Sequence, residues 1–269
     1  MMFAVSRPLR FLLLVALVGC GVPGLALAQT ECPRADLPAY AHNDYANAQP
    51  LREALALGYQ GVEVDLYLVK GELRLGHDRR AATRGSTLAS LYLEPLQALL
   101  AQCRSAPDMA PRLLLTIEIK EASRETYDSL AVTLARYPAV ARNVRVVLVG
   151  WHPNDVVLDS AAVPVAHQLR VTSAQVPPRT DVGRHVALLS IDYGKTSGRW
   201  WVRAATRQRW LDVMRDIKQA YPALRLRVHN VPTDSTLYRA LRLAGVDLIG
   251  TKQLAASAAL LRADVPLNR

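Results

Sequence analysis

The feature that most constrains this chain is a repeated alternation of short apolar runs with segments whose apolar residues recur at helical spacing. The apolar runs are rich in Val, Leu and Ile, which is typical of strands buried on both faces. The predicted strands are 39–42, 61–68, 72–77, 113–120, 144–150, 163–167, 186–192, 224–229 and 246–251, and the predicted helices are 49–57, 87–103, 124–137, 210–220, 236–244 and 253–261. This order predicts an α/β fold with a parallel sheet.

Length and composition favour a closed α/β barrel over an open α/β sheet. The chain has 269 residues, of which 51% are hydrophobic and 21% charged, so a disordered chain is excluded. A (βα)8 TIM barrel of about 250 residues is an ordinary single domain. A doubly wound open sheet is the alternative, but no Gly-rich phosphate fingerprint follows the first strand. We therefore expect a single TIM-barrel domain over residues 29–269.

Residues 1–28 have the order of a secretory signal. Arg7 and Arg10 precede the apolar run 11–18, and Ala26-Leu27-Ala28 closes the segment as a small-x-small cleavage site. Gly and Pro residues interrupt the run well short of the roughly 20 apolar residues of a membrane anchor. We expect cleavage after Ala28 and export to the periplasm or the medium. The alternative is a lipoprotein anchored at Cys20, because residues 17–20 resemble a lipobox.

The charge of the chain favours anionic partners. Its formal net charge is +10, and loss of the two arginines in residues 1–28 lowers this by two, to +8. A basic exported protein suits phosphate esters or anionic lipid surfaces. No Lys/Arg-rich block of five or more occurs, so we expect no nucleic-acid partner. We also expect a monomer.

Three cysteines exclude a Cys-rich zinc scaffold. The expected cleavage after Ala28 removes Cys20. Cys32 and Cys103 then remain in an oxidising compartment. Cys32 precedes the first strand and Cys103 ends the helix after the second, so both belong to the N-terminal rim of a barrel. We expect a disulfide between them.

Polar residues stand at the ends of three predicted strands, where an apolar core does not need them. His42 ends the first strand. Glu63 and Asp65 are spaced i, i+2 and share one face of the second strand. Glu118 and Lys120 repeat that arrangement at the end of the strand 113–120. In a parallel barrel these ends lie on the rim where active sites are built.

A second histidine joins this group through the predicted hairpin. If the chain reverses at Lys70-Gly71, antiparallel partners have residue numbers that sum to roughly 141–142. His77 then lies beside Asp65. Two histidines and three carboxylates therefore converge from distant parts of the sequence.

The composition of this cluster indicates its chemistry. Three converging carboxylates repel one another, and a hard divalent cation with oxygen ligands, Mg²⁺ or Ca²⁺, is the natural counter-ion. Two histidines suit general acid–base catalysis. Taken singly, each residue has an ordinary structural explanation, such as a hydrogen-bonded histidine or a surface ion pair. Their joint placement on one rim favours an active site.

The motifs resemble a known superfamily. The segments AHNDY (41–45), GVEVDLYL (61–68), LRLGHD (73–78), EIK (118–120), Arg227 to Pro232 and GVDLIGT (245–251) resemble PLC-like phosphodiesterases. That superfamily includes glycerophosphodiester phosphodiesterases, bacterial phosphatidylinositol-specific phospholipases C and sphingomyelinase D. AHNDY and LYLEPLQALL (91–100) look most like the subgroup of altered-inheritance-of-mitochondria proteins.

The resemblance implies a TIM barrel that cleaves phosphodiesters with one divalent metal. It implies that His42 and His77 are the acid–base pair. It implies that the metal ligands are Glu63, Asp65 and Glu118. Lys120 matches a basic residue near the phosphate. Asn43 stands where glycerophosphodiester phosphodiesterases usually have an arginine that holds the phosphate, which leaves a donor without its charge.

We therefore expect an exported metal-dependent phosphoric diester hydrolase, or a cyclising lyase, that acts on a phospholipid or a glycerophosphodiester-like substrate. A non-catalytic barrel that binds phosphorylated ligands is the alternative, and a glycosidase with paired carboxylates is a third possibility. Two further features stay open. His229 and Asn230 either face the site or form a structural pair. The Arg and Trp residues at 199–201 and 209–210 either contact lipid headgroups or pack against the core.

Overall fold

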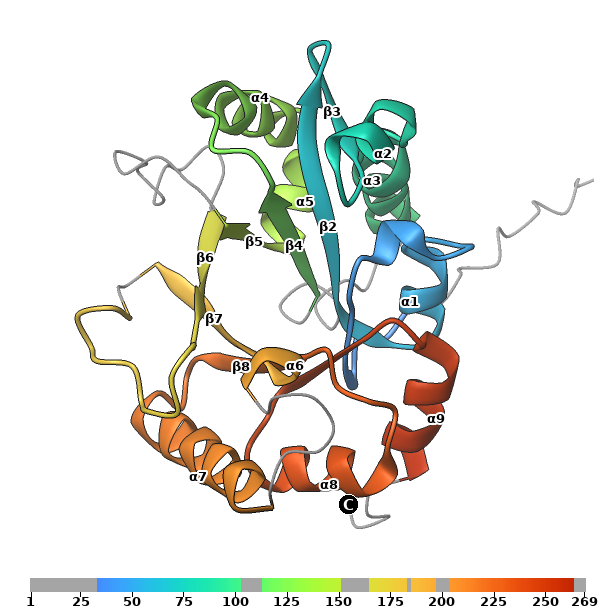
Figure 1. Cartoon of the computed structure of the whole chain (residues 1–269). Coiled ribbons are helices and arrows are strands. Elements are labelled where there is room, and N and C mark those ends of the chain that lie inside the picture. Colours follow the sequence, from blue (N-terminus) through green and yellow to red (C-terminus); the bar gives the residue numbers. More distant parts are fainter. Residues whose placement is uncertain (1–32, 103–112, 151–164, 183–184, 197–203, 264–269) are drawn as a thin grey trace, which may run out of the picture.

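Parallel strands close into a barrel in the computed structural model, which describes residues 33–102, 113–150, 165–182, 185–196 and 204–263 (Figure 1). The strands of the barrel are β1 (Leu37–Ala41), β2 (Tyr59–Val69), β4 (Leu114–Ile119), β5 (Arg145–Gly150), β6 (Val165–Arg170), β7 (Val186–Asp192), β8 (Arg225–His229) and β9 (Leu248–Thr251). Neighbours pair in this order, and β1 closes the ring by pairing with both β2 and β9. The predicted (βα)8 TIM barrel is confirmed, and the open-sheet alternative is wrong.

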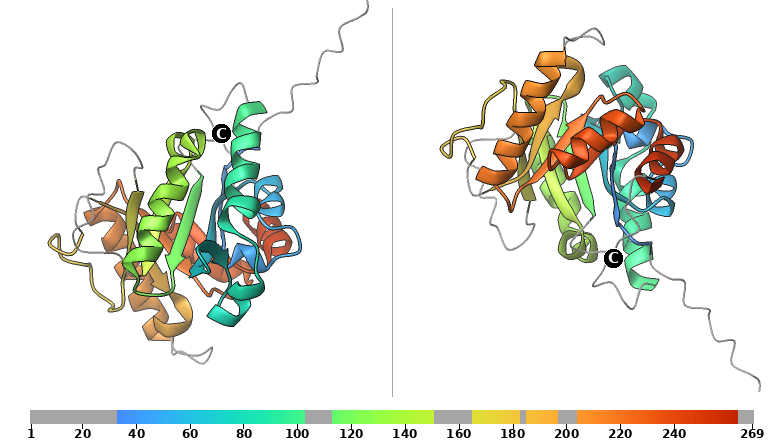
Figure 2. Two further views of the ribbon diagram at one scale, coloured as in Figure 1. Left: turned by 90° about the horizontal axis from the view of Figure 1, so that it is seen from above. Right: turned by 90° about the horizontal axis from the view of Figure 1, so that it is seen from below.

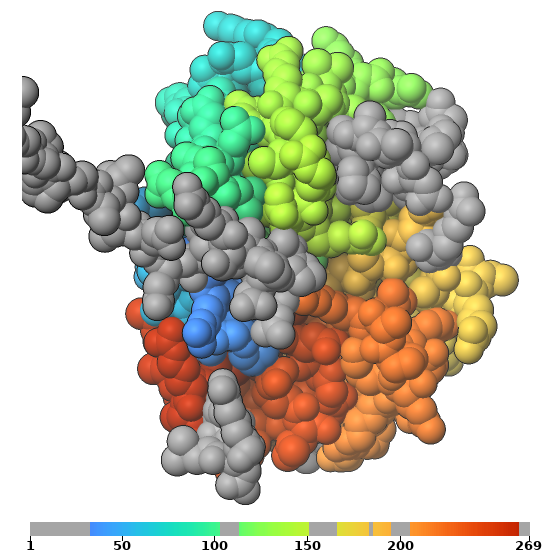
Figure 3. All heavy atoms as spheres, turned by 180° about the vertical axis from the view of Figure 1, so that it is seen from behind, coloured from blue at the N-terminus to red at the C-terminus, as the bar shows by residue number. Residues whose placement is uncertain are grey.

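Helices follow most of the strands and cover the outside of the barrel, whereas the described residues 171–182 between β6 and β7 form no helix (Figures 1 and 2). They are α1 (Arg52–Ala56), α2 (Arg79–Arg84), α3 (Glu94–Gln102), α4 (Arg124–Ala135), α5 (Pro138–Asn143), α6 (Tyr193–Thr196), α7 (Ala204–Ala220), α8 (Ser235–Leu243) and α9 (Leu254–Ala263). A 3₁₀ turn, η1 (Asp44–Ala46), follows β1, and a π-helical turn, η2 (Ala89–Leu93), leads into α3. In the space-filling view from behind, α3 to α5 (teal to yellow-green) lie above α7 to α9 (orange to red) (Figure 3).

Side-chain caps explain where three of the helices begin. The Asp78 carboxylate accepts a hydrogen bond from the Ala81 amide at 2.8 Å, ahead of α2. The Ser123 hydroxyl and the Asp234 carboxylate do the same for α4 and α8. Each cap satisfies an amide that has no partner in the first helical turn. Helix α2 was not predicted, nor were α5 and α6, because they are too short for helical periodicity to show. The predicted helix 49–57 begins only at Arg52, after Leu51 at φ 60°.

The predicted hairpin is confirmed in detail. Lys70 and Gly71 both have positive φ, at 51° and 79°, as a two-residue hairpin turn requires. They join β2 to the antiparallel strand β3 (Glu72–Leu75). Leu66 pairs with Leu75 and Val69 with Glu72, so partner numbers sum to 141, as predicted. The hairpin projects beyond the barrel at the upper edge of Figure 1.

The inside of the barrel is filled by a small apolar layer near its N-terminal end. It consists of Tyr40, Leu114, Val147, Ala166, Leu188 and Leu248, separate from the larger core between strands and helices. Gly61 makes room for this layer, because a Cβ there would lie 2.4 Å from Cδ2 of Tyr40. The layer plugs the barrel, so polar side chains above it face the C-terminal rim.

Several expectations fall on residues outside the described ranges: the signal segment 1–28, Cys20, the disulfide between Cys32 and Cys103, and residues 199–201. Of the residues proposed to contact lipid, Trp210 is 7% exposed and packs into the core. None of the helices in the described ranges is long and apolar enough to span a bilayer.

Candidate active site

The register of the barrel brings the predicted site residues to one rim. Asp65 on β2 pairs directly with Glu118 on β4, and Glu63 pairs with Thr116 one layer below. His42 follows β1, where its amide donates to the Thr251 carbonyl at 2.9 Å. His42 and His77 follow β1 and β3, and Glu118 lies near the end of β4. Glu63 and Asp65 lie in the middle of β2, because this strand continues past the barrel into the hairpin with β3. All of them stand at the C-terminal rim, where active sites of this fold form.

Asp65 holds His77. The His77 Nδ1 atom lies 3.0 Å from Oδ2 of Asp65, and the Tyr45 hydroxyl donates to the same oxygen at 2.8 Å. Asp65 is 1% exposed, whereas the His77 side chain is 72% exposed. A buried carboxylate therefore orients an exposed imidazole and fixes Nδ1 as its donor, which leaves Nε2 to exchange protons. Burial and the bond to Asp65 raise the pKa of Tyr45, so this hydroxyl stays a donor. The sequence did not single out Tyr45.

The other predicted histidine lies beside Glu63. The His42 Nε2 atom lies 3.4 Å from Oε2 of Glu63, and Glu63 is only 2% exposed. Burial lowers the pKa of His42 below its ordinary value, and the positive charges of Arg227 and Lys252 lower it further. The carboxylates of Glu63 and Asp65 act in the opposite direction but do not outweigh burial.

Lys120 stands between the other two carboxylates. Its Nζ lies 3.4 Å from Oε1 of Glu118 and 3.8 Å from Oδ1 of Asp65. Burial lowers the pKa of Lys120, but the two carboxylates raise it by more, so the ammonium stays charged. This places a cation beside the histidine–carboxylate pairs.

Arg227 on β8 is a second cation at the site, and it was predicted only as part of the resemblance. It is 2% exposed, and its Nη1 lies 3.6 Å from Oε1 of Glu63. Its guanidinium also stacks over the Tyr40 ring, 4.3 Å from the centroid. Arg227 therefore balances the charge of Glu63 from inside the barrel. The alternation Arg225-Leu226-Arg227 in a buried strand was the available signal.

The open question about His229 is answered by its position. The His229 ring meets the His42 ring edge to face, with centroids 5.4 Å apart. Its Nδ1 lies 3.3 Å from the Ser190 hydroxyl and its Nε2 lies 3.7 Å from Oδ2 of Asp192. Asn230 donates to Oδ1 of Asp192 at 3.0 Å. His229 thus packs against His42 from β8, which is separated from β1 by β9 alone.

Asn43 lies beside His42 on the same rim. It is 9% exposed and adopts a left-handed conformation, at φ 54°. Its neighbour Asp44 is fully buried and anchors the loop. Asn43 therefore lies at the C-terminal rim beside His42.

Two of the three carboxylates at the rim have an oxygen without a hydrogen-bond partner, which a cation could compensate. Oε2 of Glu63 and Oδ1 of Asp65 are buried and make no hydrogen bond. Such oxygens are costly unless a positive charge compensates them. Within the described part of the chain, no cluster of three or more His, Cys, Asp or Glu side chains is arranged to hold a metal ion. Lys120 instead contacts two of the carboxylates.

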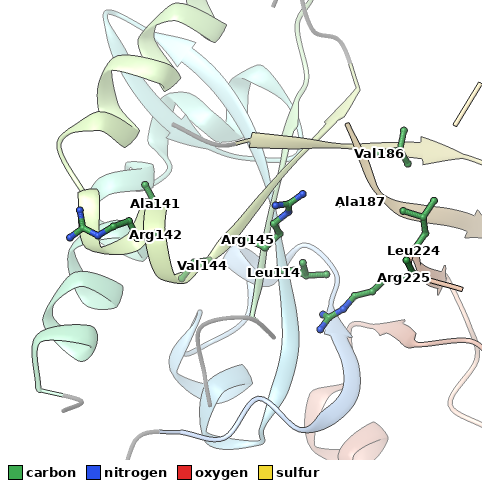
Figure 4. Close-up of a pocket in the computed structure, with 10 residues that line it drawn as sticks. Leu114, Ala141, Arg142, Val144, Arg145, Val186, Ala187, Leu224 and Arg225 are labelled. Atoms are coloured by element: carbon green, nitrogen blue, oxygen red, sulfur yellow. The ribbon is translucent and has the colours of Figure 1, made fainter. Parts of the chain in front are cut away.

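Two pockets lie at opposite ends of the barrel. The smaller, about 190 Å³, adjoins His42 and is lined by the loops after β8 and β9. The larger, about 490 Å³, lies among the N-terminal ends of β4, β5, β7 and β8 and is lined by Arg142, Arg145 and Arg225 with apolar residues (Figure 4). Of these two pockets, only the smaller one adjoins a predicted catalytic residue, so it is the better candidate for binding substrate.

Comparison with known proteins supports the resemblance. Residues 34–143 match the AIM6-like phosphodiesterase domain. This stretch contains every predicted catalytic and metal-binding residue. The resemblance to the altered-inheritance-of-mitochondria subgroup is confirmed. The match runs from the segment before β1 to the end of α5, so the remaining strands of the barrel lie outside it.

Individual relatives agree with this match. The altered inheritance of mitochondria protein 6 of Eremothecium gossypii is 30% identical over 173 residues, which cover 54% of this chain and 44% of that protein. An altered inheritance of mitochondria protein 6 homolog from Arthroderma benhamiae is 37% identical over 70 residues, 24% of this chain and 22% of the relative. The chain thus matches less than half the length of these curated relatives.

The fold itself recurs in solved structures of distant sequence. A lead(II) complex of malate synthase from Haloferax volcanii aligns with a TM-score of 0.53 at 11% identity, over 88% of this chain and 75% of that one. This likeness concerns the barrel alone.

Proposed function

We propose that this protein is an exported, metal-dependent phosphoric diester hydrolase, or a cyclising lyase, acting on a phospholipid headgroup or a glycerophosphodiester-like substrate. The observation that carries the proposal is the pairing of each rim histidine with a buried carboxylate, His42 with Glu63 and His77 with Asp65. The AIM6-like phosphodiesterase match over the same residues supports it.

Cleavage of a phosphodiester needs one proton taken from the attacking oxygen and one delivered to the leaving oxygen. Two imidazoles held by separate carboxylates are suited to these two roles. Asp65 fixes the His77 tautomer through Nδ1, and Glu63 lies against Nε2 of His42. Each carboxylate also stabilises the imidazolium that forms when its partner gains a proton.

The charge on the phosphoryl oxygens needs compensation in the transition state. Lys120, already at the rim between Asp65 and Glu118, is suited to this role. Glu63, Asp65 and Glu118 would hold one divalent cation, Mg²⁺ or Ca²⁺, which would supply further positive charge beside those oxygens. Lys120 would then be released from the carboxylates toward the substrate.

The setting of the reaction is part of the proposal. The signal-like residues 1–28 support export, and the net charge of +8 that remains after their removal favours anionic phosphodiesters or lipid surfaces. We propose that the barrel acts as a monomer.

Metal dependence tests this proposal. Asp65→Asn keeps the shape of the side chain but removes a charge, so we expect it to weaken binding of Mg²⁺ or Ca²⁺ by about tenfold or more. Asp128→Asn, at an exposed carboxylate on α4, is the matched control and should leave the affinity unchanged. Isothermal calorimetry on the folded proteins measures both. Equal affinity in wild type and Asp65→Asn would remove Asp65 as a ligand.

A further inference from the structure

The pocket beside His42 has a composition unlike that of the rest of the rim. Its walls are His42 and the loops after β8 and β9, with Asn230 and Thr233 on one side and Lys252 and Gln253 on the other. No carboxylate is among the described residues that line it. Lys252 is exposed and is the only permanently charged side chain of the described lining. The rim carboxylates at β2 and β4 thus lie outside the lining of this pocket, whose described residues include one cation, Lys252.

The two loops are linked to one another before any ligand binds. The Thr233 hydroxyl donates to Oε1 of the Gln253 side chain at 3.0 Å. The backbone amide of Gln253 donates to the Thr251 hydroxyl at 2.9 Å. Because Oε1 of the Gln253 side chain already accepts this bond, its side-chain NH₂ group is the donor that can face a ligand. Asn230 is held at φ 57° while its side chain binds Asp192.

The location of the pocket also indicates a ligand class. Because β3 lies outside the ring, β8 and β9 are the seventh and eighth strands of the barrel. Loops after these two strands form a phosphate-binding site in many TIM barrels. A volume of about 190 Å³ is far below the range of roughly 300–1,000 Å³ of pockets that hold a whole ligand. The pocket is sized for one small group.

We infer that the pocket of His42, Asn230, Thr233, Lys252 and Gln253 is a subsite for a second phosphate, carried as a monoester on one alcohol arm of the diester substrate. This inference rests on the proposed function, because His42 forms both a wall of the pocket and part of the proposed catalytic pair. The diester lies over the histidines, and the monoester reaches the β8 and β9 loops, where Lys252 supplies charge and Gln253 and Thr233 supply polar groups.

The subsite predicts a preference between two matched substrates. One is the 4-nitrophenyl phosphodiester of glycerol, and the other is the same diester with a second phosphate on the glycerol. We expect wild-type kcat/KM to be about tenfold higher for the bisphosphate. Lys252→Gln should lose this preference. Arg136→Gln, which removes an exposed charge at the far end of α4, should keep it. No preference in wild type, or an unchanged preference in Lys252→Gln, would overturn the subsite.

Failure of the proposed function is distinguishable from failure of the subsite. If neither diester is cleaved, the catalytic proposal fails, and the subsite is judged by calorimetric binding of glycerol 3-phosphate. A loss of about tenfold in affinity in Lys252→Gln, with Arg136→Gln unchanged, supports the subsite. Equal affinity in all three proteins overturns it.

Discussion

At the scale of single residues, the site is organised by charge balance. Three carboxylates face two built-in cations: Lys120 contacts Asp65 and Glu118, and Arg227 contacts Glu63. One negative charge is left over among these five groups. A divalent cation would compensate it, so added positive charge at this site would favour an anionic substrate.

Arg227 tests this balance directly. Arg227→Met would leave the Glu63 carboxylate buried with its main permanent cation removed, which typically costs about 3–5 kcal/mol of unfolding free energy. Adding Glu63→Gln should recover part of that loss, because the neutral amide no longer needs a counter-ion. Urea unfolding of the two single variants and the double variant measures the coupling. Strictly additive losses would mean that Arg227 does not balance Glu63.

The residues that could be predicted from sequence are those whose partners are close along one hairpin or on adjacent strands. The pairing of His77 with Asp65 follows from a two-residue turn and its register. Arg227 and His229 reach the site only because the barrel closes, which brings β8 and β9 round to the side of β1 and β2. No local pattern encodes that contact. Tyr45 was missed because its position depends on the fold of the loop after β1.

At the scale of elements, the loop after β1 is held by one buried carboxylate. Asp44 accepts hydrogen bonds from the Tyr92 hydroxyl at 2.7 Å and the Leu51 amide at 2.6 Å. Asn47 donates to its other oxygen at 3.1 Å. Tyr92 belongs to the π-helical turn η2, so this carboxylate joins the loop that carries His42 and Tyr45 to the segment before α3. Burial raises the pKa of Asp44, and these three bonds act against that rise.

Tyr92→Phe tests this anchor. Loss of the hydroxyl removes a hydrogen bond to a buried carboxylate, which should cost about 1.5–3 kcal/mol of unfolding free energy at neutral pH. The Tyr92 bond lowers the pKa of Asp44, so the stability that it provides is present when Asp44 is ionised and is lost as the pH falls. The difference in unfolding free energy between wild type and Tyr92→Phe should therefore shrink from pH 7 to about pH 4.

Urea unfolding at a series of pH values checks both the size and the sign of this effect. Tyr137→Phe, whose hydroxyl makes a long bond of 3.5 Å to Glu94, is a suitable control and should change stability little. A Tyr92→Phe difference that grows on acidification would contradict the assigned role of Asp44.

The strands were easier to predict than the helices for a physical reason. Strands buried on both faces need continuous apolar runs, and these stand out in the sequence. Helix α2 has six residues and α6 four, so neither shows a full amphipathic repeat. The start of α1 depends on Leu51 at positive φ, which its side chain does not signal.

At the scale of the whole molecule, the apolar interior of the barrel and the polar site residues occupy separate layers. The apolar layer around Tyr40 closes the interior, and the histidines, carboxylates and Lys120 stand above it at the C-terminal rim. The AIM6-like phosphodiesterase match over residues 34–143 carries these residues. Arg227, His229 and Lys252, on or after β8 and β9, lie outside the match and border the same rim. Closure of the ring is thus what completes the site.

The central claim is that the two rim histidines cleave phosphodiesters, and the rate of bis(4-nitrophenyl) phosphate cleavage at saturating Mg²⁺ or Ca²⁺ tests it most directly. We predict turnover by wild type that EDTA abolishes. His42→Ala and His77→Ala should each lower turnover by about 10²–10⁴-fold, the usual contribution of a positioned acid or base. The double variant should lose less than the product, because the two groups act as a unit. His185→Ala, a histidine outside the site, should retain full activity. Near-wild-type turnover by folded His42→Ala or His77→Ala, or no turnover by wild type with either metal, would contradict the claim.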